Sequence, residues 1–348
     1  MSVTLKLKQS STPGAIPLLG DLSFGEVAIN TYDAKLYGRI DNGVDQVVLL
    51  NTVPTGLEYI TEGGSSGWRL IGANSDNYGD IGHKAVDFSQ SDAASTTRGA
   101  SGSYSMAFGS NLAVTGNGSL GGGIGGTNQG QGCVNIGMGN WISNVTGSAA
   151  FGGSNEMHGQ GGFVCGWGNE VTQNYGFASG YYTKALGVRS TSMGHNGRAS
   201  GTNSMNVNGT TYATGESSFA SGYRTVAEGY ASHSGGTGTQ PSHNFIVRGR
   251  ASFGHQEVTA SLYDINANNS AILGGKNNTN TVTAERSVIL GGTEQVATQA
   301  DTVYLHQIKF KGRGTDPTGV ESGTLYYNSS SETLRLYTSS GWKTLATI

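Results

Sequence analysis

Small and large side chains alternate ahead of a glycine that recurs every fourteen residues through the middle of the chain. With one extra residue before Gly152, the series is Gly109, Gly123, Gly137, Gly152, Gly166, Gly180, Gly194, Asn208, Gly222 and Gly236. Positions two and four before each member hold small residues, such as Ala220 and Ser218. Positions one and three before it include Met106, Phe108, Val134, Ile136, Phe151, Phe163, Phe177, Met193, Met205, Val207 and Phe219. Because side chains of a strand alternate between faces, this pattern predicts a short strand with small residues facing a narrow interior and large ones facing outward.

A second short strand is predicted in each coil, ahead of a second series that runs half a period out of phase. Its members are Gly102, Gly116, Gly130, Asn144, Gly159, Gln173, Gly187, Gly201, Gly215 and Gly229. Two residues earlier stand Val114, Ile142, Met157, Val171, Ala185, Ala199, Ala213 and Ala227, which fit an interior. Three residues earlier stand Glu156, Glu170, Lys184, Arg198 and Tyr212, which fit a solvent-facing row. One strand of each coil is thus predicted to have an apolar outer face, and the other a polar one.

The continuous apolar ladder predicts an interface between chains, since exposed apolar patches of that size mark interaction surfaces. We explain both glycine series by turns that require positive φ, which glycine adopts freely and asparagine tolerates, although Gln173 fits this explanation poorly. The run GGGIGG at 121–126 is interpreted as a coil without room for side chains, with local polyglycine-type packing as the alternative.

Three regions follow from these patterns: an N-terminal β module at 1–85, a β-roll repeat array at 86–258, and longer coils with a C-terminal β module at 259–348. No segment predicts a long helix, because each interior glycine costs a helix about 0.5–1 kcal/mol relative to alanine. The predicted fold class is all-β, with a central parallel β-roll of fourteen-residue glycine repeats flanked by small β modules.

The two flanks echo each other. The spacing Gly25, Asn30, Leu36-Tyr37 parallels Gly323, Asn328, Leu336-Tyr337, and SSGWRLI at 65–71 parallels SSGWKTL at 339–345. Each flank is interpreted as a strand, a polar turn and a second strand closed by a tryptophan. Such modules would cap the open ends of a repeat array.

Composition narrows the class of protein. The 348 residues include 58 glycines but also 16 Tyr, 10 Phe and 4 Trp, which argues against a disordered linker. A net charge of −3 argues against nucleic-acid binding. No apolar run approaches the length of a membrane span, so no membrane insertion is expected, and the start MSVTLKLKQSS is a strand pattern rather than a secretion signal. Cys133 and Cys165 are interpreted as small packed residues.

Two units of the array carry a family resemblance. SYSMAFGSNLAVTG at 103–116 and SSFASGYRTVAEG at 217–229 resemble the head repeats of trimeric autotransporter adhesins. That resemblance covers about half of the chain and implies a left-handed parallel β-roll with three chains side by side. The export signal, coiled-coil stalk and C-terminal membrane anchor of those adhesins are not visible, which puts a bacterial surface adhesin in doubt.

The flanks resemble another group of proteins. GDLSFGEVAINTYDAKLYGRI at 20–40 looks like the N-terminal motif common in bacteriophage tail-fibre proteins, and GTLYYNSSSETLRLYTSSGWKTL at 323–345 looks like a second recurring phage-fibre segment. The resemblance implies a homotrimeric tail fibre of the virion that joins other tail or baseplate proteins. Its further partner would be a host surface polysaccharide or outer-membrane protein. The alternatives are a structural virion fibre or spacer without receptor binding, and a polysaccharide-degrading tailspike.

Catalytic chemistry is not indicated. Acidic residues such as Asp41, Asp45 and Asp76 are scattered in predicted turns rather than paired as a glycosidase requires, and the glycine strings lack the GK[ST] of a phosphate loop. We therefore predict no enzyme activity and no cofactor. His306 is the least poor candidate for an ion on a trimer axis, but we expect it to face solvent or a hydrogen-bond partner, so no metal site is predicted.

Exposed aromatic residues with polar neighbours suit contact with saccharide or protein. On the array the candidates for receptor binding are Tyr181, Tyr182, Tyr212 and Tyr223, and in the last module they are Tyr326, Tyr327, Tyr337 and Trp342. In the last module the favoured alternative is that Tyr337 and Trp342 close a small hydrophobic core, as Tyr37 and Trp68 would in the first module. On the array the structural and functional interpretations are evenly balanced.

Overall fold

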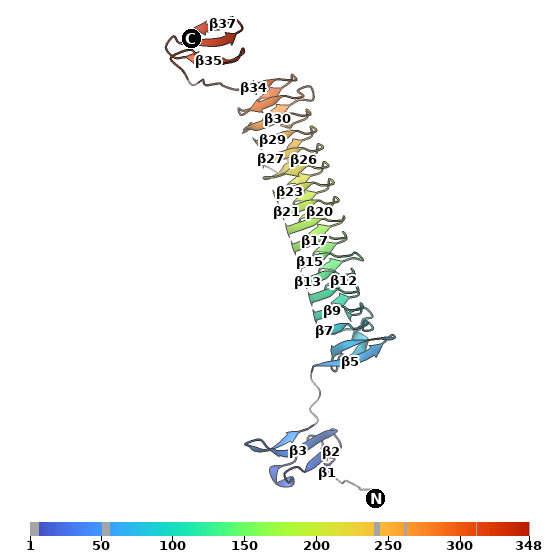
Figure 1. Ribbon diagram of the computed structural model, residues 1–348. Helices are drawn as coiled ribbons and strands as arrows, with labels where there is room; N and C mark the ends of the chain where they lie inside the picture. Colours follow the sequence, from blue (N-terminus) through green and yellow to red (C-terminus); the bar gives the residue numbers. More distant parts are fainter. Residues whose placement is uncertain (1–6, 51–55, 240–243, 261–262, 311, 348) are drawn as a thin grey trace. The chain divides into compact units, whose positions relative to one another are not determined.

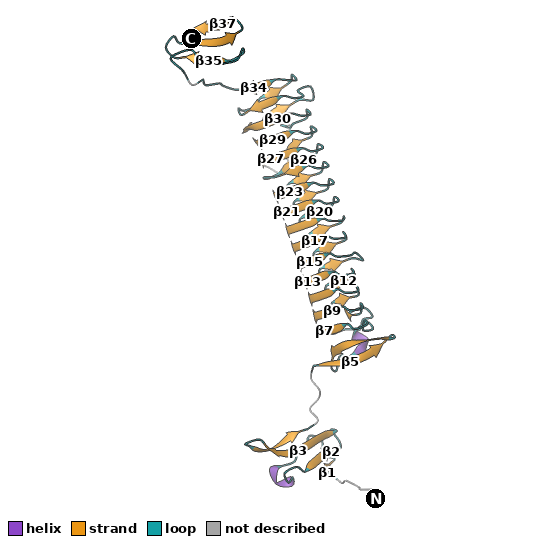
Figure 2. Cartoon of the chain, viewed as in Figure 1, coloured by secondary structure: helices purple, strands orange, loops and turns teal. Residues whose placement is uncertain are grey.

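The computed structural model describes residues 7–50, 56–239, 244–260, 263–310 and 312–347. Over these residues the chain is an all-β parallel solenoid of about 17 turns with almost no helix, and the strands of successive turns are stacked in Figures 1 and 2. The all-β class predicted from the sequence is therefore confirmed. Two compact units, Met1–Gly139 and Asn140–Ile348, are described in turn.

Unit 1 contains a four-stranded sheet and the first coils. Its elements are β1 Lys8–Ser10, η1 Leu19–Asp21, β2 Val27–Asn30, β3 Lys35–Asp41, β4 Asp45–Leu49, β5 Leu57–Glu62, β6 Ser65–Leu70, η2 Ser75–Asn77, β7 Val86–Gln90, β8 Gly99–Ala100, β9 Met106–Ser110, β10 Ala113–Val114, β11 Leu120–Ile124, β12 Thr127–Asn128 and β13 Val134–Met138. In the four-stranded sheet β1 and β2 are parallel, and β2, β3 and β4 are antiparallel. The β5–β6 hairpin then starts a parallel sheet through β7, β9, β11 and β13. The alternation predicted over Val3 and Leu5 lies outside the described residues.

Unit 2 continues with coils of the same kind. Its elements are β14 Trp141–Ile142, β15 Ala149–Gly153, β16 Glu156–Met157, β17 Phe163–Trp167, β18 Glu170–Val171, β19 Phe177–Tyr181, β20 Lys184–Ala185, β21 Thr191–His195, β22 Arg198–Ala199, β23 Met205–Gly209, β24 Tyr212–Ala213, β25 Phe219–Ala220, β26 Thr225–Ala227, β27 His233–Gly238, β28 Phe245–Val247, β29 Phe253–Val258, β30 Ala271–Lys276, β31 Thr279–Asn280, β32 Val288–Leu290, β33 Val296–Ala297, β34 Val303–Leu305, β35 Leu325–Asn328, β36 Thr333–Thr338 and β37 Gly341–Thr347. The last three strands form a separate antiparallel sheet.

Most coils contribute one strand to a parallel long-strand sheet and one to a parallel short-strand sheet. In unit 1 the long-strand sheet consists of β7, β9, β11 and β13, and the short-strand sheet consists of β8, β10 and β12. In unit 2 the long-strand sheet consists of β15, β17, β19, β21, β23, β25, β27, β29, β30, β32 and β34, the short-strand sheet consists of β14, β16, β18, β20, β22, β24, β26 and β28, and β31 and β33 form a separate parallel pair. Pairing is in register, so that Phe163 faces Phe177 and Gly166 faces Gly180.

The interior between the two sheets is narrow, as the alternation predicts. Ala107, Ala150, Val164 and Ala178 of the long-strand sheet are buried, whereas the large residues beside them face outward. The short-strand residues expected inside are all buried as well: Val114, Ile142, Met157, Val171, Ala185, Ala199, Ala213 and Ala227. These predicted orientations are confirmed.

Buried asparagines occupy the corners between the sheets, three residues after the glycine, a feature that the sequence interpretation missed. The Asn155 Nδ2 donates to the carbonyl oxygens of Phe151 and Gly166, both at 2.9 Å, and its Oδ1 accepts from the Asn169 N–H at 3.0 Å. The Asn169 Nδ2 repeats this with Cys165 and Gly180, both at 2.8 Å. Carbonyl groups at a buried corner require such partners, and the amides supply them from coil to coil.

The two glycine series share a close approach to the next coil but differ in backbone conformation. In the first series a Cβ on Gly109 would lie 2.0 Å from the Gly123 oxygen. Members of the first series have positive φ, from 75° at Asn208 to 136° at Gly137, as expected for a turn. Members of the second series do not; a Cβ on Gly116 would lie 1.8 Å from the Gly130 oxygen, and one on Gly187 would lie 2.1 Å from the Gly201 oxygen. The positive φ falls two residues later, often on a non-glycine such as Arg189. Our explanation by turns is right for the first series. It is wrong for the second series, where a side chain would collide with the backbone of the next coil.

Local packing tests two further predictions. In the GGGIGG run a Cβ on Gly121 would lie 2.2 Å from Val114 Cγ2, and one on Gly122 would lie 2.1 Å from the Phe108 ring, so the coil has no room for side chains there, as predicted. Cys133 is buried as expected. Cys165 is half-buried, because it stands one residue before Gly166 and points to the outer side.

The echo between the flanks is confirmed for their hairpins. In the β2–β3 turn the Asn30 Oδ1 accepts from the backbone N–H groups of Tyr32 and Asp33, at 3.0 and 3.2 Å. In the β35–β36 turn the Asn328 Oδ1 accepts from Ser330 and Ser331, at 3.0 and 3.1 Å. Both turns end on a residue with positive φ, Ala34 at 55° and Glu332 at 52°.

The tryptophans of the two flanks are not equivalent. Trp342 packs against Tyr337 with ring centroids 5.1 Å apart, within one small sheet. Trp68 instead lies on β6 against Tyr59 and is 44% exposed, whereas Tyr37 is buried in the four-stranded sheet. In the first module β4 pairs with β3, and in the last module β37, which carries Trp342, pairs with β36. The position that Trp68 was expected to occupy is therefore taken by β4. The expected closure of the first module by Trp68 is therefore wrong, and the region boundaries after residues 85 and 258 stay predictions.

Candidate functional site

The outer side of the long-strand sheet is an apolar face. In unit 2 its ladder includes Phe151, Phe163, Phe177, Met193, Met205, Val207, Phe219, His233, Phe253, Leu273 and Leu290. Neighbouring coils stack these side chains: the Phe163 and Phe177 rings are 5.5 Å apart and nearly parallel. All of these side chains remain half-buried or exposed, since nothing in the described chain covers their outer side. Unit 1 presents Phe88, Met106 and Phe108 in the same way.

Two histidines of the described chain, His233 and His255, interrupt the apolar face. The His233 ring lies between Phe219 and Phe253, with centroids at 4.7 and 4.6 Å. Burial lowers the pKa of His233 below its ordinary value, and the neighbouring His255 lowers it further. The neutral imidazole is thus the form that suits this face.

Three of the four predicted tyrosines of the array, Tyr181, Tyr182 and Tyr223, lie along one corner of unit 2. Tyr181 and Tyr182 contact each other with centroids 4.4 Å apart, and Tyr181 stacks on His195 at 5.5 Å. Tyr223 lies under the guanidinium of Arg224 at 5.0 Å. All three tyrosines are 44–47% exposed. Whether they contact a receptor stays a prediction.

Tyr212 lies with Tyr182 in a surface depression of about 600 Å³ on the outer side of the short-strand sheet. Four neighbouring strands, β18, β20, β22 and β24, contribute Glu170, Lys184, Arg198 and Tyr212 in register. The remaining lining residues are Tyr182, Leu186, Asn196, Gly197 and Thr210. The sequence interpretation named the charged residues only as a solvent-facing row, because their meeting with Tyr182 depends on stacking of the coils.

The aromatic residues of the last module form a packed cluster. Tyr326 is 7% exposed; its ring lies 4.8 Å from Trp342, and its hydroxyl donates to Asp316 Oδ1. The Trp342 Nε1 donates to the Pro317 oxygen at 3.2 Å. These contacts are those of the small core expected as the alternative to receptor binding. Tyr327, Tyr337 and Trp342 are half-buried rather than exposed.

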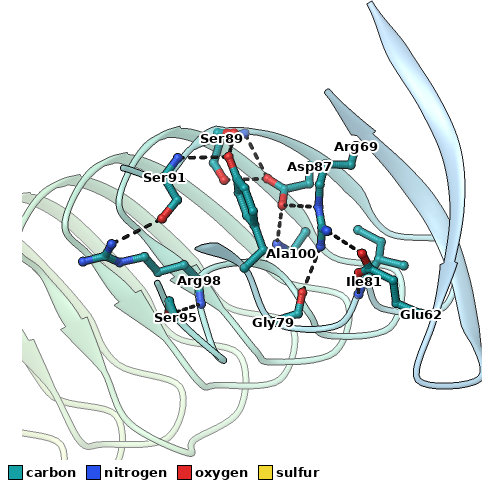
Figure 3. Close-up of polar contacts among 11 residues, drawn as sticks. Glu62, Arg69, Gly79, Ile81, Asp87, Ser89, Ser91, Ser95, Arg98 and Ala100 are labelled. Carbon is teal, nitrogen blue, oxygen red and sulfur yellow. Dashed lines mark hydrogen bonds and ion pairs between the residues drawn. The ribbon is translucent and has the colours of Figure 1, made fainter. Parts of the chain in front are cut away.

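A buried charge cluster lies at the start of the solenoid in unit 1 (Figure 3). The Arg69 guanidinium donates to Glu62 Oε1 at 2.8 Å and to the Gly79 oxygen at 2.9 Å, and its Nε lies 3.6 Å from Asp87 Oδ2. Asp87 is fully buried and also accepts from the Ser89 hydroxyl at 2.6 Å. A carboxylate buried in this way cannot reach a substrate. The cluster instead provides hydrogen-bond and ion-pair partners for polar groups in the first turns of the coil stack.

Unit 1 also has a depression of about 650 Å³ between β1, β2 and the segment at 15–22. Among the described residues, no group of three or more His, Cys, Asp or Glu side chains is placed to hold a metal ion. His306 is exposed just beyond β34. No helix within the described part of the chain has the length and apolar character to cross a membrane.

Comparisons with known proteins returned neither a matching family model nor a matching curated protein.

Proposed function

We propose that the chain is one subunit of a homotrimeric fibre, in which the fourteen-residue glycine repeat is the building unit. The observation that carries this proposal is the apolar face. Its stacked phenylalanines form a ladder that water contacts in the single chain. A continuous apolar surface of this kind marks an association surface. Partner chains that bring the same face together would bury it.

The fibre is proposed to belong to a bacteriophage virion and to attach it to the bacterial host surface. The resemblance of 20–40 and 323–345 to tail-fibre segments supports this role. In the N-terminal module the exposed side chains of Ile16, Leu18 and Phe24 offer contacts for another tail or baseplate protein. The polar outer side of the short-strand sheet remains for a host polysaccharide or outer-membrane protein.

Sedimentation velocity or native mass spectrometry of the full chain tests the trimer. We expect three times the chain mass of 35.9 kDa. A species of one chain mass at micromolar concentration would overturn the assembly.

Binding of fluorescently labelled trimer to a panel of bacterial strains tests attachment. Retention on at least one strain, saturable by unlabelled protein, is expected. A trimer that is retained on none is a structural fibre or spacer instead. Release of reducing ends from capsule or lipopolysaccharide during incubation would favour the polysaccharide-degrading tailspike.

A further inference from the structure

The depression on the short-strand sheet of unit 2 carries one charge that the protein itself does not neutralise. Lys184 and Glu170 pair with each other, Nζ to Oε2, at 2.7 Å. Arg198, the next residue in the row, is exposed, and its guanidinium has no hydrogen-bond or ion-pair partner among the described residues. One negative and two positive groups leave the depression with a formal charge of +1, on a chain whose net charge is −3.

A guanidinium that projects unpaired into a depression is suited to a planar anion. Its N–H groups form a rigid fork that matches the two oxygens of a carboxylate, and such charge-assisted pairs are stronger than neutral hydrogen bonds. The neighbouring Asn196 amide and Thr210 hydroxyl add neutral donors and acceptors of the kind that hydroxyl-rich ligands use.

Three further lining residues add apolar surface. Tyr182 comes from the turn after β19, Tyr212 from β24, and Leu186 from the turn after β20. Tyrosine offers a rigid apolar ring together with a polar tip, which matches the C–H face and the hydroxyl edge of a pyranose. A few polar groups placed among aromatic side chains are typical of small-ligand sites.

The depression also lies on the side of the coil that the proposed trimer leaves free. The apolar face belongs to the long-strand sheet, whereas Glu170, Lys184, Arg198 and Tyr212 all stand on the outer row of the short-strand sheet. Association through the apolar face is therefore compatible with an occupied depression.

We propose that this depression binds an acidic saccharide, with Arg198 holding the carboxylate of a uronic or sialic acid unit and with Tyr182 and Tyr212 contacting the ring. The proposal deepens, and rests on, the proposed attachment to a host surface. It assigns the recognised chemistry to a carboxylated sugar.

A panel of immobilised oligosaccharides tests the ligand class with the full-length protein. Its arms carry glucuronic, galacturonic or sialic acid, phosphate-bearing sugars, and neutral glucans of matched length. We expect binding to at least one carboxylated arm, at least tenfold tighter than to neutral glucans and to the phosphate arm. Equal binding to neutral glucans, preference for phosphate, or no binding to any carboxylated arm overturns the proposal.

Variants of the row then test the residue. Arg198→Ala is expected to weaken binding to the preferred carboxylated sugar at least tenfold, and Arg198→Lys less, because lysine keeps the charge but loses the planar fork. Glu170→Gln is expected to tighten binding about threefold by removing the competing carboxylate. The matched control is Arg189→Ala, which removes an exposed arginine that binds the Asn203 Oδ1 outside the depression. Equal effects of Arg198→Ala and Arg189→Ala would rule out the assigned site.

Cell binding separates this proposal from the attachment function. If strains retain the wild type and Arg198→Ala equally, attachment stands and the assigned site is wrong. If no strain retains the wild type while Arg198 still determines binding to a carboxylated sugar, the site stands and attachment in the proposed form fails. Unchanged circular dichroism of both arginine variants shows that their coils are intact.

Discussion

The two sheets of the solenoid share one interior but present opposite surfaces. The long-strand sheet stacks phenylalanine on phenylalanine along its outer side, as Phe163 does on Phe177. The short-strand sheet places an ion pair of Glu170 and Lys184 at the equivalent position, with Arg198 beside it. Both outer rows are built by the same in-register stacking, so the residues at equivalent positions of successive coils lie next to one another. We infer that the first sheet serves association and the second recognition.

The largest effect is expected from a charge on the apolar face. Phe177→Glu would put three carboxylates into the proposed interface, where burying an unpaired charge costs several kcal/mol, so the trimer should dissociate. The same replacement on the other sheet, Tyr212→Glu, should leave the trimer intact. Sedimentation velocity measures both, and a trimeric Phe177→Glu protein would contradict the assignment of the faces.

A methyl group at the corner of the short-strand sheet should have the next largest effect. Gly116→Ala would press a Cβ against the Gly130 oxygen of the next coil, and we expect a loss of about 3 kcal/mol of stability. The control is Gly118→Ala, two residues away, where a Cβ meets nothing within 4 Å at a φ of +63°. It should lose only about 1 kcal/mol, as alanine already occupies such a turn at Ala231. Urea unfolding followed by circular dichroism compares the two variants, and equal losses would return the second series to a turn explanation.

The corner amides should contribute less. Asn169→Ala leaves the Gly180 oxygen and the Thr183 N–H without their partner, which should cost about 1–3 kcal/mol. Asn174→Ala, which removes an exposed acceptor for the Gln160 N–H, should change stability by less than about 0.5 kcal/mol. Urea unfolding measures the difference. A smaller effect at Asn169 would show that water replaces the amide at this corner.

The smallest effect is a pH dependence of the apolar face. Because the pKa of His233 is lowered in the folded chain, the unfolded chain takes up the proton first as the pH falls below the ordinary histidine pKa of 6.5. The stability of the folded chain should therefore be greatest above that pH and decline as the pH falls toward 5. The melting temperature measures this decline. His233→Phe should flatten this slope, whereas His195→Phe, at an exposed corner position, should retain it. A slope unchanged in His233→Phe would remove the histidine from the explanation.

The sequence predicted the repeating local features well and the contacts between coils poorly. The orientation of Phe219 and Ala220 follows from the period of two in a strand, and it is confirmed. The reason for a glycine at position 116 was missed, because it depends on the Gly130 oxygen of the next coil. Trp68 was misassigned because a fourth strand, β4, takes the place that the echo between the flanks reserved for it.

The candidate site was predicted only in its parts. Tyr182 and Tyr212 were named from their exposure, and Arg198 was named as solvent-facing. Nothing in the spacing of these residues shows that a corner residue and the outer row of neighbouring coils meet in one depression. The buried Arg69–Asp87 pair likewise joins strands β6 and β7 that are separated by a polar loop.

By itself the sequence determined the all-β class, the inward and outward rows, and the positive-φ turns of the first glycine series, since each depends on the geometry of one strand or one turn. Only the tertiary structure decided why the second glycine series exists, how the corner amides are satisfied, and which side chains share the depression around Arg198. These features arise between coils, where a methyl group finds an oxygen at 1.8 Å and an amide finds the next coil at 2.8 Å. Such distances are set by the stacking of coils and are not encoded in any one repeat.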